Sequence, residues 1–337
     1  MHVNGMSNPL VSVIIPAYNV TRYIKQAIDS ALNQQFTDCE IIVINDNCPD
    51  TVNLELALNS YGSKIRYLKH PVNSGPAATR NTGIIAARGE LVAFLDGDDI
   101  WESRYLETQI GVLRRHPEAH VVYCDALIIG DTKDVGKHLM EMSPSNGPVT
   151  LLSLFRQQVQ VLISVLIRKE MLFKVGLLDP APALRASEDF DLWVRIVKAG
   201  GKIIYHREQL FRYRRHAESL SSDGVRIGQS ALAVASKTLK RTDLSNEERF
   251  AIEDTAARWR SDLSLEQGKR YLIKGNYRAA LTSFLATLDY KRPGLKFGIQ
   301  RLKIIAVCDL IRVVPGLLRL LLYLRREIMS FRKNYTA

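Results

Sequence analysis

The sequence predicts an α/β domain with a doubly wound, mainly parallel sheet, followed by a helical C-terminal region. In the first half, short apolar runs rich in β-branched residues alternate with stretches of helical length, which is the pattern of parallel strands joined by helices. Several of these runs end in polar clusters, and doubly wound sheets bind ligands at the carboxyl ends of their strands. Beyond residue 221 the chain is mostly helical in pattern.

The elements of the first half follow from the hydrophobic pattern in chain order. The first strand is expected over Val11 to Ile15, an apolar run that ends in Pro16. Further strands are expected over residues 41–44, 65–68, 91–95 and 121–123, and helices over residues 23–33, 77–87 and 102–115. Residues 130–150 are rich in Gly, Asp, Ser and Pro, which predicts a loop.

The second half becomes increasingly helical. A strand is expected over residues 161–167, a helix from Glu188 through Ile196, and short strands over residues 203–205 and 209–213. Longer helices are expected over residues 230–239, 246–272 and 277–288. The last two helices resemble one tetratricopeptide-like hairpin, which is a single unit and not an array.

These patterns divide the chain into four parts. We expect a disordered N-terminus over residues 1–9, the α/β domain over 10–222, a helical extension over 223–292 and a basic amphipathic tail over 293–337. The 337 residues are 46% hydrophobic and 24% charged, which is typical of globular proteins and argues against global disorder.

The cysteines and the N-terminus predict a cytoplasmic protein. The four cysteines are widely scattered without C-x-x-C spacing, which argues against structural zinc and a disulfide framework. The first ten residues lack the basic and long apolar regions of a secretory signal.

The positive charge is concentrated in the tail. The formal net charge of the chain is +11, and residues 291–337 hold eleven basic and two acidic residues, a net charge of +9. An enzyme acting on nucleic acid would carry basic residues around its cleft, so we expect no nucleic-acid partner. The separate basic segment points instead to a membrane surface.

Two acidic clusters predict the chemistry. Asp96, Gly97 and Asp98 directly follow an apolar strand, and carboxylates in this spacing suit Mg²⁺ or Mn²⁺ holding a diphosphate. Glu188 and Asp189 form a second cluster far away in sequence, from which a carboxylate can act as general base on an incoming hydroxyl. Together they suggest metal-assisted transfer from a nucleotide-activated donor.

The chain resembles the family-2 glycosyltransferases, inverting enzymes of the GT-A fold, over about residues 10–220. The resemblance lies in the order and spacing of four segments, VSVIIPAYN (11–19), NSGPAATRNTG (73–83), LDGDD (95–99) and SEDFDLW (187–193). It implies a nucleotide-diphospho-sugar donor, a divalent metal and a hydroxyl acceptor.

The resemblance assigns the nucleotide pocket to the ends of the first two strands. The segment Pro16, Ala17, Tyr18 and Asn19 would line this pocket, with the Tyr18 ring packing on a pyrimidine; a core tyrosine is the alternative. Asp46 would accept a hydrogen bond from uracil, or belong to a plain turn. The usual Asp-Asp-Gly-Ser pattern reads Asn-Asp-Asn-Cys from residue 45. Uridine is therefore expected, with thymidine and guanosine left open.

The resemblance places the diphosphate and the metal at the fourth strand. Asp98 would ligate Mn²⁺ or Mg²⁺, Asp96 would contact the ribose or the metal shell, and Gly97 would permit close backbone approach. Arg80 would face the crevice and pair with Asp46 or a phosphate, or form a surface salt bridge instead. His216 matches a histidine near the metal or diphosphate, although a histidine in a basic stretch is often merely exposed.

Asp189 matches the catalytic base of the family. It would take the acceptor proton as oxygen attacks the anomeric carbon, inverting its configuration. Asp191 would point elsewhere on the helix, and Glu188 and Asp191 could instead be acidic residues favoured at a helix N-terminus.

The tail has the pattern of a basic amphipathic helix. Arg312, Arg319, Arg326 and Lys333 are seven residues apart beside a leucine-rich sequence, so the charges line one face. Charges and Pro315 interrupt the apolar content, which argues against a spanning helix. We expect residues 300–337 to bind anionic membranes, or their leucines to pack on the domain.

The expected function is therefore a metal-dependent inverting glycosyltransferase of the hexosyltransferase type. It would move a sugar from a nucleotide-diphospho-sugar, with a UDP-sugar expected, to a glycan or lipid-linked acceptor at the inner membrane face, in polysaccharide and cell-envelope synthesis. Two other classes remain open. A nucleotidyltransferase is disfavoured because residues 16–19 lack the Gly and Lys of a phosphate loop. A non-catalytic nucleotide-sugar-binding or scaffolding protein is disfavoured because both Asp98 and Asp189 are present.

Overall fold

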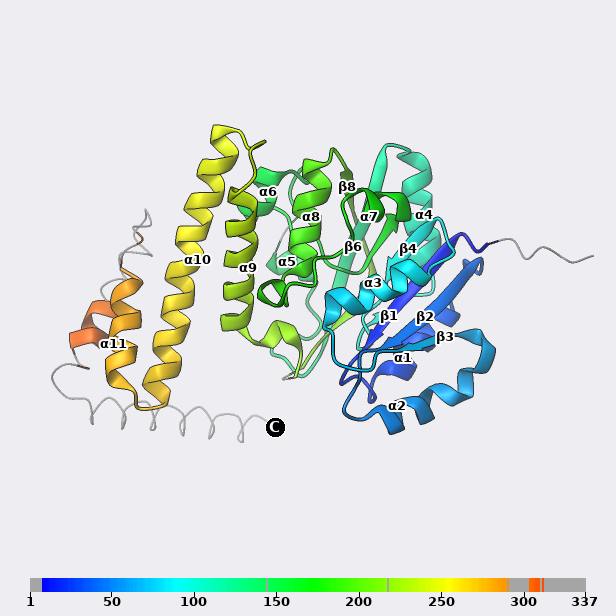
Figure 1. Cartoon of the computed structure of the whole chain (residues 1–337), viewed down its shortest axis with the longest axis horizontal. Coiled ribbons are helices and arrows are strands. Elements are labelled where there is room, and N and C mark those ends of the chain that lie inside the picture. The colour runs from blue at the N-terminus through cyan, green and yellow to red at the C-terminus, as the bar shows by residue number, and fades with distance from the viewer. Residues whose placement is uncertain are drawn as a thin grey trace, which may run out of the picture.

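The computed structural model describes residues 8–143, 145–216, 218–288, 290, 303–309 and 311. Its centre is an eight-stranded mixed sheet in the order β3-β2-β1-β4-β7-β6-β8-β5, with helices on both faces and the helices α9 to α11 stacked beyond one side (Figure 1). The expected α/β class with a helical C-terminal region is confirmed.

The parallel half of the sheet contains the four predicted strands: the first two are two and three residues longer than predicted, the third is shifted by one residue, and the fourth is one residue shorter. It consists of β1 (Val11–Ala17), β2 (Cys39–Asn45), β3 (Arg66–Lys69) and β4 (Leu91–Phe94). Helices α1 (Ile24–Leu32) and α2 (Thr51–Leu58), with the 3₁₀ turn Asn59–Lys64, join the first three strands. Alternate β1 residues enter two hydrophobic clusters, one on each sheet face, because side chains alternate along a strand.

Helix α3 (Pro76–Ala86) packs unusually close to the sheet. It begins after Gly75, whose φ of 86° suits glycine, and has Pro76 in its first turn, where the missing N–H costs nothing. A Cβ built on Gly83 would lie 2.5 Å from the Ile14 Cγ2 atom and 3.0 Å from the Ile44 Cδ1 atom. Because Arg80 is one turn earlier on the same face, this close packing places its side chain against the carboxyl end of the sheet.

The other half of the sheet mixes strand directions. It consists of β5 (Ile100–Trp101), β6 (Ala119–Gly130), β7 (Val165–Arg168) and β8 (Lys202–Arg215). Strand β7 is antiparallel to β4 and β6, and β5 is antiparallel to β8, whereas β6 and β8 are parallel. The two short strands expected near residue 206 form one strand, β8, whose pairing with β6 shifts register on both sides of Asp125.

The helices of this half depart from the sequence prediction in number and in bounds. They are α4 (Tyr105–Arg115), α5 (Leu139–Met142), α6 (Leu151–Phe155), α7 (Lys169–Lys174) and α8 (Glu188–Lys198). The expected loop over residues 130–150 contains α5, and α6 and α7 were not expected. All three are at most six residues long, too short to show helical periodicity.

The helical extension contains α9 (Gly224–Leu239), α10 (Asn246–Ile273) and α11 (Tyr277–Ala286). Helix α9 begins six residues before the predicted start, at the Asp223 cap, whose carboxylate accepts two backbone hydrogen bonds. Buried residues of α9 and α10, including Val234 and Ile252, belong to the same hydrophobic cluster as strands β4 and β7. Helix α11 instead packs with the end of α10 and residues 304–311 in a separate small cluster.

Most of the predicted tail, and the predicted disordered N-terminus up to residue 7, lie outside the described residues. In the part of the chain that the structure describes, no helix is both long and apolar enough to cross a membrane.

Candidate active site

A cavity of about 680 Å³ opens at the carboxyl ends of β1, β2 and β4. Its opposite wall is formed by the end of β8, the start of α8 and residues 218–227 of the following segment. Every predicted site residue lines it, namely Pro16, Ala17, Tyr18, Asn19, Asp46, Arg80, Asp96, Gly97, Asp98, Asp189 and His216. Segments up to 200 residues apart in sequence thus meet at one site.

The end of β1 presents Tyr18 to the cavity. The Tyr18 side chain is 39% exposed, so the alternative of a core tyrosine is wrong. The next residue, Asn19, has a φ of 55°, and its N–H lies 3.4 Å from the Cys48 Sγ atom, which accepts this weak bond. This turn holds the strand end against the loop after β2, with Tyr18 at the cavity wall.

Asp46 is held by hydrogen bonds from two backbone N–H groups and by a contact with a histidine ring. Its two carboxylate oxygens accept 2.8 Å hydrogen bonds from the N–H groups of Ser74 and Gly75, and His70 Nδ1 lies 2.8 Å from Oδ1. The Asp46 side chain is 4% exposed and makes no pair with Arg80, contrary to one expectation. Oδ2 accepts only the Gly75 bond among the described residues, so it keeps a lone pair with which to accept a bond from a nucleotide base.

Asn45, the amide that departs from the family pattern, serves the fold. Its Nδ2 donates to Thr51 Oγ1 at 3.1 Å and to Tyr67 Oη at 2.9 Å, while its Oδ1 accepts from Cys48 N–H at 2.8 Å. It is fully buried and absent from the cavity wall. Asparagine both donates and accepts, which an ionised aspartate at this position could not do.

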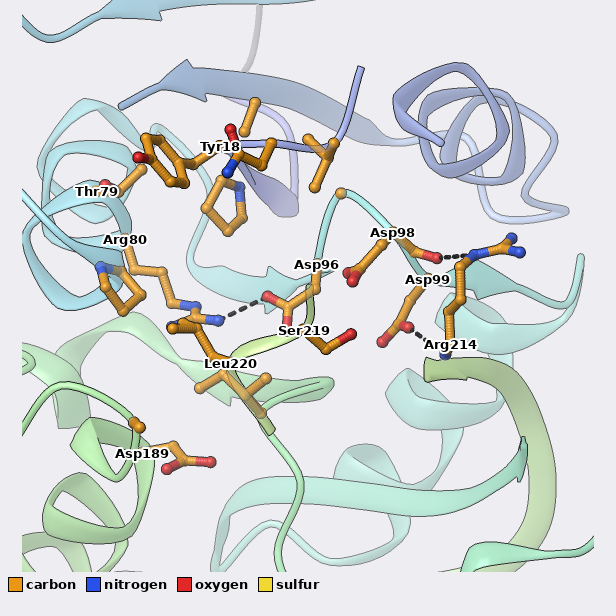
Figure 2. A pocket seen from close by; sticks show the side chains of 18 of the residues that line it. Tyr18, Thr79, Arg80, Asp96, Asp98, Asp99, Asp189, Arg214, Ser219 and Leu220 are labelled. Atoms are coloured by element: carbon orange, nitrogen blue, oxygen red, sulfur yellow. Dashed lines mark hydrogen bonds and ion pairs between the residues drawn. The ribbon is translucent and has the colours of Figure 1, made fainter. Parts of the chain in front are cut away.

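Arg80 connects the two acidic clusters. Its Nη2 donates to Asp96 Oδ1 at 2.6 Å and its Nη1 to Glu188 Oε1 at 2.8 Å, and the arginine is 5% exposed (Figure 2). The surface salt bridge considered for Arg80 is therefore wrong. Burial lowers the pKa of Arg80, but the two carboxylates outweigh this and raise it above its usual value. One buried cation thus fixes the distance between the Asp-x-Asp turn and the start of α8.

Asp98 and His216 form the candidate metal site. His216 Nε2 lies 3.0 Å from Asp98 Oδ2, and both face the cavity beside Asp96. Burial and the Asp96 charge raise the pKa of Asp98, and burial with the charges of Asp98 and Asp96 raises that of Asp99 well above its usual value.

This donor set fits a hard divalent cation. Carboxylate oxygens suit Mg²⁺ or Mn²⁺, and a cation would neutralise the mutual repulsion of these acids. Within the described ranges, no three His, Cys, Asp or Glu side chains form a complete metal cluster. Substrate oxygens would therefore supply the remaining ligands.

Gly97 permits a close approach, but to the protein itself. A Cβ on Gly97 would lie 2.9 Å from the Pro16 carbonyl oxygen and 2.9 Å from the Val20 Cγ2 atom. The glycine therefore lets the Asp-x-Asp turn lie directly on the end of β1, which brings the nucleotide segment and the acidic turn together.

Asp189 lies across the cavity from the acidic turn and points into it (Figure 2). Within the described ranges, its carboxylate accepts one hydrogen bond, from the N–H of its neighbour Phe190 at 2.7 Å. Burial and the Glu188 charge raise the pKa of Asp189 to about 7, opposed by that bond and by Arg80. A half-buried carboxylate with this pKa is suited to accept a proton near neutral pH.

The two other acids of α8 have structural partners. Glu188 accepts hydrogen bonds from Arg80 and from the Ala186 N–H, so it has specific partners in addition to its favourable position at the helix N-terminus. Asp191 is 1% exposed, pairs with Arg195 and Lys237 and is absent from the cavity wall, as its helical position predicts. Of the three, Asp189 alone faces the cavity without an ion-pair partner in the described structure.

Arg214, a wall residue that sequence reasoning missed, supports the acidic turn. Its N–H donates to Asp99 Oδ1 at 2.8 Å, and its Nε donates to the Asp98 carbonyl at 2.7 Å (Figure 2). The run Arg-Tyr-Arg-Arg before His216 was the available signal, but it could not tell which arginine turns inward. Strand alternation places Arg212 and Arg214 on the same face of the sheet, so the sequence pattern alone could not show that Arg214 is the one that contacts the acidic turn.

The fold and this cavity define the class of protein. The fold matches the S. aureus TarS 1–349 structure in complex with UDP-GlcNAc, with a TM-score of 0.59 and 19% identity over 82% of this chain and 81% of that one. It also matches the mannosyltransferase PcManGT from Pyrobaculum calidifontis in complex with GDP-Man and Mn²⁺, with a TM-score of 0.58 and 16% identity over 93% and 85% of the two chains. The chain therefore has the GT-A-type glycosyltransferase fold.

Sequence relatives identify the family. Residues 12–177 match glycosyl transferase family 2. An uncharacterized glycosyltransferase of Rickettsia prowazekii is 31% identical over 289 residues, which are 84% of this chain and 86% of the relative. One of Haemophilus influenzae is 25% identical over 85% of this chain and its own full length. The protein belongs to glycosyltransferase family 2.

Proposed function

We propose that this glycosyltransferase moves a hexose, with inversion, from a nucleoside diphosphate sugar to a hydroxyl, using Asp189 as the base. The observation that carries the proposal is the carboxylate of Asp189, which has no ion-pair partner in the described structure and faces the Asp96–Asp98 turn across one cavity. A base on one side of the sugar and a diphosphate site on the other suit displacement at the anomeric carbon from the face opposite the leaving group.

The donor would lie along the parallel half of the site. Tyr18 and Asp46 would contact the nucleotide base of the donor, and Arg80 would keep Asp96 oriented toward the ribose. Asp98 and His216 would hold Mg²⁺ or Mn²⁺, which neutralises charge on the leaving diphosphate when bound. The TarS complex with UDP-GlcNAc favours a UDP-sugar here, and the PcManGT complex with GDP-Man and Mn²⁺ keeps GDP-sugars open.

The reaction would use one proton acceptor. The acceptor hydroxyl attacks the anomeric carbon, its proton passes to Asp189, and the bond from that carbon to the diphosphate oxygen breaks. The pKa of about 7 at Asp189 supports this role, because the base must be ionised before attack and basic enough to take a proton during it.

Thermal unfolding with a panel of nucleotide sugars tests the donor and the metal together. We expect a UDP-sugar with Mn²⁺ to raise the melting temperature, because a ligand at 100 times its Kd stabilises the native state by about 2.7 kcal/mol. The Asp98→Asn variant is the matched control and should lose the Mn²⁺-dependent part. If no nucleotide sugar stabilises the protein, the proposal fails, and the alternative of a scaffolding protein gains ground.

We also propose that residues 300–337 attach the enzyme to anionic membranes, where a lipid-linked or glycan acceptor would be available. The support is the net charge of +9 after residue 290 beside leucine-rich sequence, since each basic residue near such a surface contributes about 1 kcal/mol. Cosedimentation with vesicles containing phosphatidylserine should remove the whole chain from solution and leave a chain ending at residue 299 behind. Equal sedimentation of both chains contradicts the proposal.

A further inference from the structure

The first turn of α8 carries the proposed base, and each residue beside that base is held by a different part of the protein. On the N-terminal side, Glu188 is held by Arg80 from α3, in the α/β domain. On the C-terminal side, Phe190 and Asp191 contact side chains of α9 and α10, which follow the segment matched to the family.

Asp191 is tied to α9 through Lys237. Lys237 Nζ lies 2.7 Å from Asp191 Oδ1 and 2.7 Å from Asp179 Oδ2, so it joins α8 to the loop that precedes it. The other Asp191 oxygen accepts a 2.8 Å bond from Arg195 Nε. The Asp191 side chain is 2% exposed, and a buried carboxylate with two cations holds its geometry more firmly than a surface pair does.

Phe190 is tied to α10 through Trp259. The Phe190 and Trp259 rings lie 6.0 Å apart at 77°, and the Phe155 ring of α6 lies 5.2 Å from Phe190 at 67°. These are edge-to-face arrangements, a geometry that aromatic pairs prefer and that is more specific in direction than an aliphatic contact. The contact begins one residue after Asp189, so any shift of the Phe190 backbone moves the base.

A third tie holds the far end of α8 and provides a comparison. Lys198 Nζ lies 3.2 Å from Glu248 Oε2 at the start of α10. It is nine residues from Asp189, or about 13 Å along the helix axis. Lys198 therefore joins the same two parts of the protein without contacting the turn that carries the base.

We propose that the helical extension positions the catalytic base, with Lys237 and Trp259 as positioning residues that fix the first turn of α8. This inference rests on the proposed role of Asp189. The α/β domain sets the distance from the base helix to the donor through Arg80, and the extension sets the direction in which Asp189 points.

The test uses the full chain and sugar transfer to water, because this needs no identified acceptor. Water attacks the anomeric carbon, Asp189 takes its proton, and nucleoside diphosphate leaves and is counted. The donor is the nucleotide sugar, UDP-GlcNAc or GDP-mannose, that stabilises the protein more. Lys237→Met should lower kcat about tenfold or more while KM and donor affinity change less than about twofold, because a displacement of about 1 Å costs up to 100-fold in rate.

Three variants separate positioning from general loosening. Lys240→Met, at an exposed lysine that directly follows the same helix and has no ion pair in the described structure, should keep the wild-type kcat. Lys198→Met should lower the melting temperature as Lys237→Met does but leave kcat within about twofold, since it acts far from the base. Lys237→Arg should restore most of the lost rate, and Trp259→Phe should lose less rate than Trp259→Leu.

The outcomes distinguish this inference from the proposed function. If Lys237→Met keeps the wild-type kcat, or loses rate only as much as Lys198→Met does, the extension does not position the base. If Asp189→Asn also keeps its rate, the proposed base itself is wrong. An inactive Asp189→Asn beside a fully active Lys237→Met overturns the inference alone.

Discussion

The two walls of the cavity differ in how firmly their functional groups are held before any ligand binds. The wall at the carboxyl ends of β1, β2 and β4, where we propose that the donor binds, is called the donor wall below. Its residues Asp46, Asp96 and Asp98 each have at least one partner within 3.0 Å. On the opposite wall, Asp189 accepts one bond from its own helix and has no ion pair in the described structure. If the proposed roles hold, the groups that recognise the donor are preorganised, and the proposed base is left free to take a proton.

The largest expected effect comes from removing the proton acceptor. Asp189→Asn keeps the shape of the side chain but not its basicity, so kcat should fall about 10³-fold while donor affinity stays within about twofold. Nucleoside diphosphate release measures the rate, and calorimetry measures donor binding. Asp191→Asn is the comparison, because Asp191 faces away from the cavity. A larger kcat loss in Asp191→Asn would reverse the assignment of the base.

A smaller but still large effect should follow from breaking the link between the walls. Arg80→Met leaves Asp96 and Glu188 without their shared cation, which should destabilise the fold by about 3 kcal/mol. Urea unfolding measures the loss. The double variant Arg80→Met with Glu188→Gln removes one stranded charge and should recover part of it. Additive losses in the double variant would mean that the two residues do not interact.

An intermediate effect is expected at the metal site. Asp98→Asn should lower donor affinity in Mn²⁺ about tenfold and leave the affinity measured in a chelator nearly unchanged, because the carboxylate acts through the cation. Calorimetry with the nucleoside diphosphate gives both values. Glu102→Gln, which removes an exposed carboxylate beside the same strand, serves as control. Metal-independent binding by the wild type would contradict this prediction.

The pH dependence should be about as large as the effect at the metal site. Asp189 must be ionised to act and its pKa is raised to about 7, so its active fraction rises with pH. Between pH 6 and pH 8 the rate under saturating donor should increase about tenfold and then level off. The profile of Lys237→Met should show whether the midpoint follows the orientation of α8. A wild-type rate that is flat over this range would place the base elsewhere.

The sequence predicted the donor wall better than the opposite wall for a physical reason. In the parallel half, each functional group follows a short buried strand, so β1 and β4 could be recognised and their polar ends assigned to one edge of the sheet. The close packing at Gly97 was also anticipated, although its partner is Pro16 and not a ligand. Local pattern and a general rule of sheet topology were sufficient there.

The opposite wall depends on contacts that no local pattern encodes. The antiparallel direction of β7, the inward turn of Arg214 and the pairing of Arg80 with Glu188 all join segments far apart in sequence. The pattern predicted that Arg80 faces the crevice, but of its two expected partners, Asp46 and a phosphate, Asp46 was wrong, because Arg80 pairs with Asp96 and Glu188 instead. Similarly, the pattern around Trp259 identified a helix and gave no sign that it packs beside the base.

The close packing of α3 has a genetic consequence. Gly83 touches no part of the cavity, yet any larger residue there must displace Ile14 or lift the helix that carries Arg80. A screen for inactive variants should therefore recover substitutions at residue 83 among those of the site itself, and second-site changes such as Ile14→Val or Ile14→Ala should suppress them. The residues found at these two positions in related sequences would then be correlated, although neither lines the cavity.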